Sequence, residues 1–302
     1  MKRTSLLVLS AIMLFVSGNL FAQVVEEEES NENLDSFYEI SNSNRTKKPF
    51  VYPYVRDADV VWKQRVWRLV DFREKMNQPF YYPREEDAGD VNYGAQGRAN
   101  LFTVLDRALR AGEIKCYKDD EFKEEEDYAD LFQRLGGVET VQIEETNPDD
   151  PDGLWGTYTK DSTIFTPVRA DNIKKMRIKE DWYVDKQRSV RDVRIIAFAL
   201  VYDRPNANGE GTSENTLGWI RYNDPAVRNL LANAEMYNPR NDVQQISYDD
   251  VFVKRLFTSY VLRTSNVYNR RIADYLTGLD ALLESEAIEE EIFNREQDMW
   301  EY

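Results

Sequence analysis

The chain has 302 residues and a formal net charge of −16 at pH 7, and it contains one cysteine and no histidine. This acidity disfavours nucleic acids and anionic membrane surfaces as partners. Without histidine there is no Ser-His-Asp or Cys-His catalytic set and no imidazole metal site, and Cys116 cannot form an intramolecular disulfide. No catalytic residue, cofactor or metal is therefore predicted, although a hydrolase that uses a pair of carboxylates remains an alternative.

The first 22 residues have the pattern of a secretory signal. Lys2 and Arg3 precede an apolar run from Leu6 to Val16, and Leu20-Phe21-Ala22 is a plausible cleavage site. Cleavage would change the net charge to −18, and no cysteine follows the site to carry a lipid anchor. We therefore expect an exported protein that is soluble or is held at a membrane only through its partners. Residues 23–49 are acidic and polar, which predicts a disordered leader.

The stretch from Asp59 to Pro83 contains two tryptophans and three arginines. Its apolar residues follow one another at steps of three or four, which predicts an amphipathic helix that ends before Pro79. The residues on this expected face are Trp62, Val66, Leu69, Phe72 and Met76.

Further along the chain, helical and strand patterns are mixed, which predicts an α+β fold with antiparallel strands. Helices are expected at residues 100–111, with Gly112 as the stop, and at 225–234, 248–262 and 270–300. Strands are expected at 113–117, 176–184, 193–202 and 217–222, with the last two forming a hairpin around a loop at 206–215. The acidic run at 118–130 is expected to be solvated surface, and residues 147–153 are expected to form a turn rather than a calcium loop.

Two short runs share the same spacing of Asn, Tyr and Pro-Arg: residues 77–84 (NQPFYYPR) and 233–240 (NAEMYNPR). The repetition predicts either two related helix–turn–helix units, within residues 50–130 and 171–271, or a chance similarity of turn residues. Residues 272–302 are expected to form a separate acidic amphipathic helix.

Three long runs resemble the gliding-motility protein family GldN, also called PorN: residues 61–83, 178–194 and 238–268. The resemblance spans Tyr52 to Arg271 and implies a domain over residues 50–271. It implies a periplasmic structural subunit of the type IX secretion system of the Bacteroidetes. Such a subunit forms a ring with an outer-membrane lipoprotein of the GldK/PorK type. It also contacts the periplasmic part of GldM/PorM, which belongs to the inner-membrane motor complex. The family supplies no catalytic residues.

Ring subunits that associate head to tail need two different contact faces, and aromatic and arginine side chains dominate such contacts. We expect one contact region at Trp62, Trp67, Arg68, Tyr81 and Tyr82, and a second at Tyr237 and Arg240. On this interpretation, Trp67→Ala lowers secretion while the protein stays folded. The alternatives are a periplasmic hydrolase with a carboxylate pair and an adaptor that binds secreted cargo through a sheet edge.

Overall fold

A computed structural model describes residues 47–83, 98–135, 137–146, 157–166, 168, 170–205, 212–241 and 243–298. The strands are β1 (Val60–Asp71), β2 (Cys116–Tyr117), β3 (Glu125–Glu126), β4 (Gly137–Thr146), β5 (Thr157–Thr166), β6 (Ile173–Asp185), β7 (Val190–Pro205), β8 (Thr212–Arg221), β9 (Glu235–Met236), β10 (Ile246–Ser247) and β11 (Tyr260–Thr264). The α-helices are α2 (Leu101–Arg110), α3 (Tyr128–Leu135), α4 (Pro225–Asn233), α5 (Tyr248–Val253) and α6 (Leu279–Asp298). Short 3-10 helices occupy Asp57–Asp59 (η2), Gln78–Phe80 (η3), Ala170–Asn172 (η4) and Ile272–Asp274 (η5).

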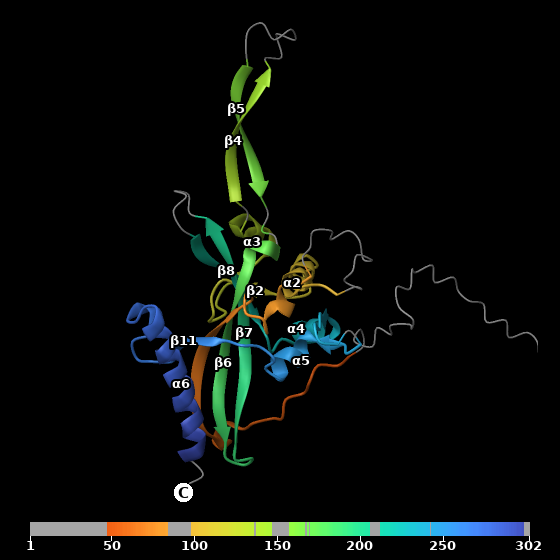
Figure 1. Cartoon of the computed structure of the whole chain (residues 1–302). Coiled ribbons are helices and arrows are strands. Elements are labelled where there is room, and N and C mark those ends of the chain that lie inside the picture. Colours follow the sequence, from red (N-terminus) through yellow and green to blue (C-terminus); the bar gives the residue numbers. More distant parts are fainter. Residues whose placement is uncertain are drawn as a thin grey trace, which may run out of the picture. The chain divides into compact units, whose positions relative to one another are not determined.

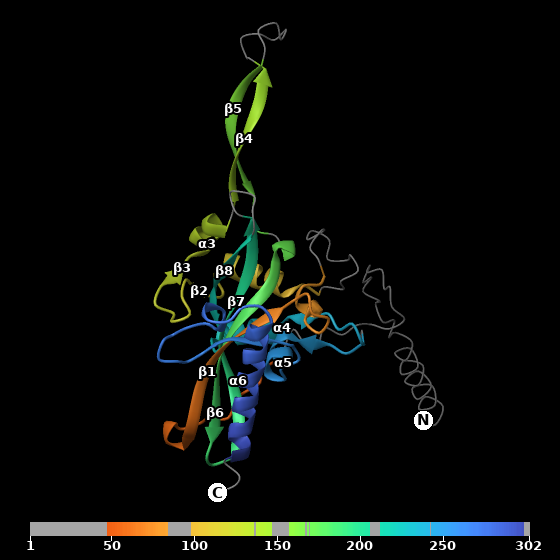
Figure 2. The same ribbon diagram turned by 60° about the vertical axis from the view of Figure 1, so that its left-hand side comes forward.

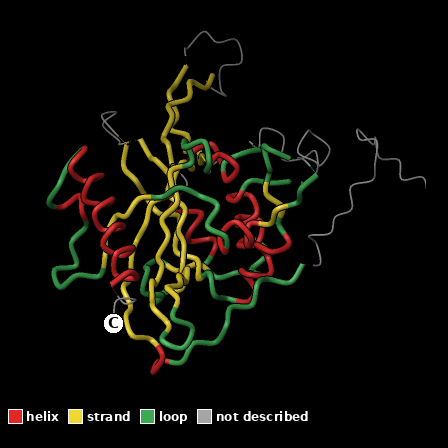
Figure 3. The backbone as a smooth tube through the Cα atoms, turned by 60° about the horizontal axis from the view of Figure 1, so that its bottom comes forward, coloured by secondary structure: helices red, strands yellow, loops and turns green. Residues whose placement is uncertain are grey.

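The fold is organised around a seven-stranded sheet with the order β11-β1-β6-β7-β8-β2-β3. All of its strand pairs are antiparallel, so the predicted α+β class is confirmed. Figures 1 and 3 show α6 beside the strands at one margin of this sheet and α4 and α5 toward the other. The predicted strands at 176–184, 193–202 and 217–222 lie in β6, β7 and β8, and β7 and β8 pair as expected.

The predicted helix over residues 59–76 is wrong, because Val60–Asp71 is the strand β1. This strand lies between β11 and β6, and its second half is almost completely buried. A strand that is covered on both faces carries apolar residues on both, so the alternation that usually identifies strands disappears. Trp62, Val66, Leu69, Phe72 and Met76 follow one another at helical spacing only by coincidence. The valines at positions 60, 61, 66 and 70 were the local sign of a strand.

Helix ends with a local capping signal were predicted well. The side chain of Asn100 accepts a hydrogen bond from the Thr103 amide at the start of α2, and Gly112 follows that helix at φ 70°. The side chain of Asp224 accepts from the Ala226 amide at the start of α4. The predicted helix at 248–262 is too long, since α5 ends at Val253 and β11 begins at Tyr260. The final helix begins at Leu279 rather than near 270. In the acidic run, two residues form β3, and α3 begins at Tyr128.

One face of the sheet carries the main hydrophobic core. Met176 and Ile178 of β6 and Phe198 of β7 are fully buried there against α2, α4 and α5. Phe80 of η3 is 2% exposed and stacks on Phe72 and Tyr248, with ring centroids 5.6 and 6.1 Å apart. The first aromatic residue of the Pro79–Pro83 segment is therefore core.

A smaller core holds α6 on the same face, beside β1 and β11. Val66 of β1, Val261 of β11 and Ile292 of α6 are buried together, and Trp62 and Trp182 pack against them. In Figure 2 this helix lies in front of β1 and β6. The hydroxyl of Ser285 in α6 accepts a hydrogen bond from the Val261 amide (2.7 Å), which covers part of the β11 edge.

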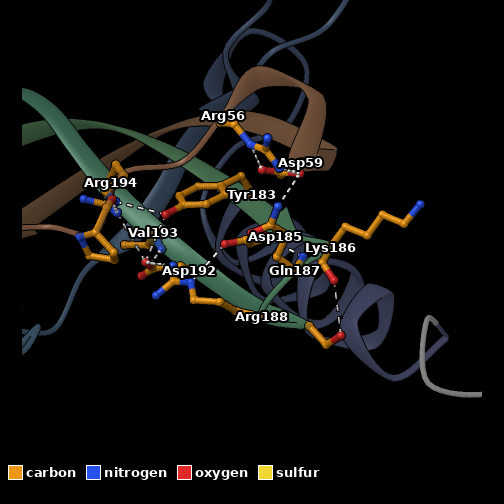
Figure 4. Close-up of polar contacts among 12 residues, drawn as sticks. Arg56, Asp59, Tyr183, Asp185, Lys186, Gln187, Arg188, Asp192, Val193 and Arg194 are labelled. Atoms are coloured by element: carbon orange, nitrogen blue, oxygen red, sulfur yellow. Dashed lines mark hydrogen bonds and ion pairs between the residues drawn. The ribbon is translucent and has the colours of Figure 1, made fainter.

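The turn between β6 and β7 is fixed by carboxylates (Figure 4). Asp185 accepts hydrogen bonds from the Gln187 amide and from Arg188 Nε, both at 2.9 Å. Asp192 accepts from the hydroxyl of Tyr183 (3.0 Å), and that hydroxyl also accepts from Arg194 Nε (3.0 Å). This network sets the register of the two longest strands at their connected ends.

The two sequence units contribute to a single sheet, since β1 and β2 come from residues 50–130 and β6, β7, β8 and β11 from residues 171–271. The proposed pair of helix–turn–helix units is wrong. The first unit begins with a strand, and the matched runs form a 3-10 helix in one case and strand β9 in the other. Strands β4 and β5 pair only with each other among the described strands. The predicted signal, nearly all of the leader, the turn at 147–153 and most of the loop at 206–215 lie outside the described residues.

Candidate interaction surfaces

An arginine-lined cleft of about 570 Å³ opens between α6 and the segment that follows α5. We refer to it as the arginine cleft. Its lining consists of Arg68, Trp182, Arg191, Arg255, Phe257, Thr258, Ser259, Glu289, Glu290, Ile292 and Phe293. Three arginines and three aromatic residues in one open cleft are the side-chain types that dominate protein–protein contacts.

A fully buried carboxylate, Glu180, lies beneath the arginine cleft. It accepts hydrogen bonds from Arg255 Nη1 (2.5 Å) and Nη2 (3.3 Å) and from Trp182 Nε1 (3.2 Å), and Arg68 Nε lies 3.4 Å away. A charge removed from water in this way needs such partners to be tolerated. Glu180 therefore serves to hold the two guanidinium groups in place.

The arginines of the cleft also hold α6 against the sheet. Arg68 donates to the Ser259 hydroxyl (2.7 Å) and to Glu289 of α6. Arg191 lies over the rings of Trp182 and Phe293, 5.1 and 5.6 Å from their centroids, and donates to the Ile292 carbonyl (3.3 Å). Glu180 and Glu289 are thus paired with arginine, whereas Glu290 of the cleft lining makes no ion pair with another described residue.

The opposite face of the sheet carries a second surface, which we call the basic face. It consists of Arg65, Trp67, Arg177, Lys179, Arg221 and Arg263. These residues are brought together by register: Trp67 lies opposite both Lys179 and Arg263, and Ala197 lies opposite both Lys179 and Arg221. Side chains on neighbouring strands at the same level point to the same face, so these cations form a row across the sheet.

Trp67 is the centre of the basic face and is half-buried. Two cations make cation–π contacts with its ring. The guanidinium carbon of Arg263 lies 3.7 Å from the ring centroid, and the ammonium of Lys179 lies 5.7 Å from it. Its indole Nε1 donates to Asp120 (2.9 Å), in the loop between β2 and β3. The guanidinium carbon of Arg221 lies 4.7 Å from the ring centroid of Phe122, which belongs to the same loop.

Burial destabilises the charged forms of several cations on the basic face. It lowers the pKa of Lys179 against the opposing influence of Asp120, and it lowers the pKa of Arg263 and Arg177. The Nε atom of Arg177 is buried and has no hydrogen-bond partner among the described residues. For Asp181, burial acts to raise the pKa, but hydrogen bonds from Arg65 and Lys63 outweigh it and the pKa is lowered. These cations would gain from further negative charge.

The predicted contact residues do not form one patch. Trp62 and Arg68 lie on the helix-covered face, at the α6 core and the arginine cleft, whereas Trp67 lies on the basic face. Tyr81 and Tyr82 pack edge to face near η3, and Tyr81 donates to Asp171 at 3.4 Å. In the predicted second region, Tyr237 is 37% exposed beside Arg98, and Arg240 is exposed. Whether any of these residues contacts a partner stays a prediction.

Reasoning from the sequence missed most of the clustered residues. Arg191, Arg255, Lys179 and Arg263 come from four separate segments, and only strand register or tertiary packing joins them. A partial signal was available in β6, where apolar and charged residues alternate from Met176 to Lys179.

A smaller apolar cavity of about 40 Å³ lies between α2, α3 and β8. A volume of this size holds only a few water molecules. Among the described residues, no group of three or more Cys, Asp or Glu side chains is arranged to hold a metal ion. None of the described helices combines the length and apolar composition that crossing a bilayer requires.

Comparison with protein families gives a match. Residues 55–301 match the family model described as gliding motility associated protein GldN. No curated protein matches the chain. Because the matched region covers most of the sequence, including every strand of the sheet and both surfaces, the chain belongs to the GldN family of gliding motility associated proteins.

Proposed function

We propose that this protein is a periplasmic structural subunit of the type IX secretion and gliding-motility machinery. In this role it forms a ring with an outer-membrane lipoprotein of the GldK/PorK type and contacts the periplasmic part of a GldM/PorM-type motor protein. Export depends on the signal at residues 1–22, and association with the outer membrane depends on the partners. The protein acts by binding and not by catalysis.

The observation that carries this proposal is the presence of two different arginine-rich and aromatic surfaces on opposite faces of one sheet. A subunit that contacts different neighbours in a closed assembly needs two such surfaces. Family membership supports the machinery to which the subunit belongs.

Two alternatives are less well supported. Glu180 and Glu289 are paired with arginine, so Glu290 is the one carboxylate at the cleft without an ion pair among the described residues, which argues against a carboxylate-pair hydrolase. A cargo adaptor that binds through the sheet edge would need an edge strand with free backbone groups. At one edge, however, the Val261 amide of β11 donates to Ser285 of α6, and at the other edge β3 has only two residues.

The proposal is tested by affinity purification of the tagged full chain from detergent-solubilised envelopes of its host. We expect the GldK/PorK-type lipoprotein and the GldM/PorM-type protein to be recovered with it. Trp67→Ala is expected to reduce recovery and secretion while circular dichroism stays native. Tyr54→Ala, at an aromatic residue that is 88% exposed in the entry segment (residues 47–56), is the matched control. Recovery of neither protein would contradict the proposal, and an unfolded Trp67→Ala variant would identify Trp67 as a residue of the core.

A further inference from the structure

The outward surface of α6 is acidic and also apolar. Ala281, Ser285, Ile288 and Ile292 lie on the side of the helix that packs against the sheet. On the other side, Leu279 is 70% exposed and Leu283 is 53% exposed. The exposed carboxylates Asp280 and Glu286 lie beside these leucines, and exposed Glu290, which also lines the arginine cleft, follows one turn after Glu286; none of the three makes an ion pair with another described residue. A helix with an exposed apolar stripe and charges beside it is typical of a helix that docks on a partner.

The basic face has the opposite character. With the ion-paired neighbours Lys63 and Lys175, it contains seven cations against three carboxylates: Lys63, Arg65, Lys175, Arg177, Lys179, Arg221 and Arg263 against Asp120, Asp181 and Glu214. The basic face thus has an excess of positive charge, although the formal net charge of the whole chain is −16. It is also accompanied by aromatic surface from Trp67 and Phe122. The ligand that fits such a face carries clustered carboxylates and apolar side chains.

The two surfaces lie on opposite sides of the same strands. Val66 of β1 packs against α6, while Trp67, the next residue, lies on the basic face. A helix of 20 residues is about 30 Å long, and a strand of 13 residues such as β6 is about 43 Å long. A helix of this length can therefore lie along the strands on this side of the sheet and cross the row of cations.

We infer that the outward surface of α6 in one copy of this chain docks on the basic face of the next copy. The argument is charge complementarity, joined to exposed leucines on α6 and half-buried aromatic rings on the basic face. Because the two surfaces differ and face away from each other, the contact is head to tail and repeats from copy to copy. Each copy carries a formal net charge of −16, so the local charge complementarity acts against the general repulsion between two copies. The inference rests on the proposed function in that it assigns the contact between neighbouring subunits of the ring.

The test uses sedimentation velocity of the mature full-length protein and two double variants. Lys63→Glu/Arg221→Glu changes exposed positions on the basic face, and Leu279→Asp/Leu283→Asp changes exposed positions on α6. The matched controls are Lys48→Glu/Lys186→Glu for charge and Val51→Asp/Val243→Asp for exposed apolar groups elsewhere. Circular dichroism and urea unfolding verify that each variant is folded.

We expect the unchanged protein and both controls to form species larger than dimers, and each test variant to be monomeric. A 1:1 mixture of the two test variants should form dimers and nothing larger, because only one intact α6 surface and one intact basic face remain to combine. Raising the salt concentration to about 1 M, where the Debye length is roughly 3 Å, should weaken association of the unchanged protein.

The inference is overturned if the unchanged protein is monomeric at about 100 μM, or if either test variant associates like its control. It is also overturned if the mixture gives no dimers, or if the basic-face variant loses only the lipoprotein in the affinity purification and still self-associates. Normal recovery of the lipoprotein without self-association removes this inference alone. Self-association without any machinery partner removes the proposed function instead.

Discussion

The buried ion pair between Arg228 of α4 and Asp249 of α5 offers the sharpest test of how this fold is held together. Both side chains are almost completely buried. Arg228 donates to Asp249 from Nε (2.6 Å) and Nη2 (3.0 Å), and Asp249 also accepts from the Tyr222 hydroxyl (2.8 Å) and the Phe50 amide (3.1 Å). Arg228 in turn donates to the Phe50 carbonyl (2.7 Å). The pair therefore fastens the entry segment to the two helices.

Replacing Asp249 with Asn keeps the shape of the side chain and removes its charge. The Arg228 guanidinium then remains buried without a counter-ion, which costs about 3–5 kcal/mol when one partner of a buried pair is removed. For a domain of roughly this size, each kcal/mol corresponds to about 2–4 °C in Tm, so a fall of about 6 to 20 °C is expected. Replacing both partners by apolar residues, as in Arg228→Met/Asp249→Leu, should cost less than Asp249→Asn alone.

Urea unfolding followed by tryptophan fluorescence measures the change in free energy, and proteolysis at the entry segment measures its release. The control is Lys115→Met, which removes an ion pair with Glu125 in which both side chains are more than half exposed. Such a pair contributes only about 0–1 kcal/mol. The reasoning is refuted if Asp249→Asn and Lys115→Met destabilise the protein equally, or if the double apolar variant is the least stable of the set.

Three further predictions follow from packing and charge. Phe80→Ala should lower the free energy of unfolding by about 3–5 kcal/mol in a urea titration, because it empties the centre of the aromatic core; a loss below about 1 kcal/mol would mean that its neighbours collapse into the space. Gly218→Ala should destabilise the protein, because Gly218 has φ +131° and an added Cβ would lie 2.2 Å from the Cys116 sulfur; adding Cys116→Ala should recover part of the loss in thermal unfolding, and no recovery would leave the backbone angle as the whole cause. The pKa of Asp71 is lowered by hydrogen bonds from Arg73 and that of Glu214 by the hydrogen bond from Lys175. Their contribution to stability is therefore complete above pH 4.5 and is lost as the pH falls below it, which unfolding measured between pH 6 and pH 3 would detect as a decline confined to the acid side.

Local signals in the sequence determined the parts of the fold whose causes are local. Asn100 and Asp224 cap the helices that follow them, and Gly112 ends α2 because it adopts a positive φ at low cost. The apolar runs of β7 and β8 also identified their pairing, since few residues separate the two strands. Membership of the GldN family was readable from three runs of residues and is confirmed by the match over residues 55–301.

Tertiary structure determined the conformation of residues 60–71. Residues 60–71 had helical spacing in isolation, but their backbone pairs with β6 and β11, strands that lie more than 100 residues away in the chain. That pairing places Trp67 and Arg68 on opposite faces, because successive side chains of a strand alternate. It also gives Arg68 its partners Glu180 and Glu289, and Trp67 its partners Lys179, Arg263 and Asp120. Composition shows only that the segment contains arginines and tryptophans. Long-range strand pairing places these residues on two different surfaces.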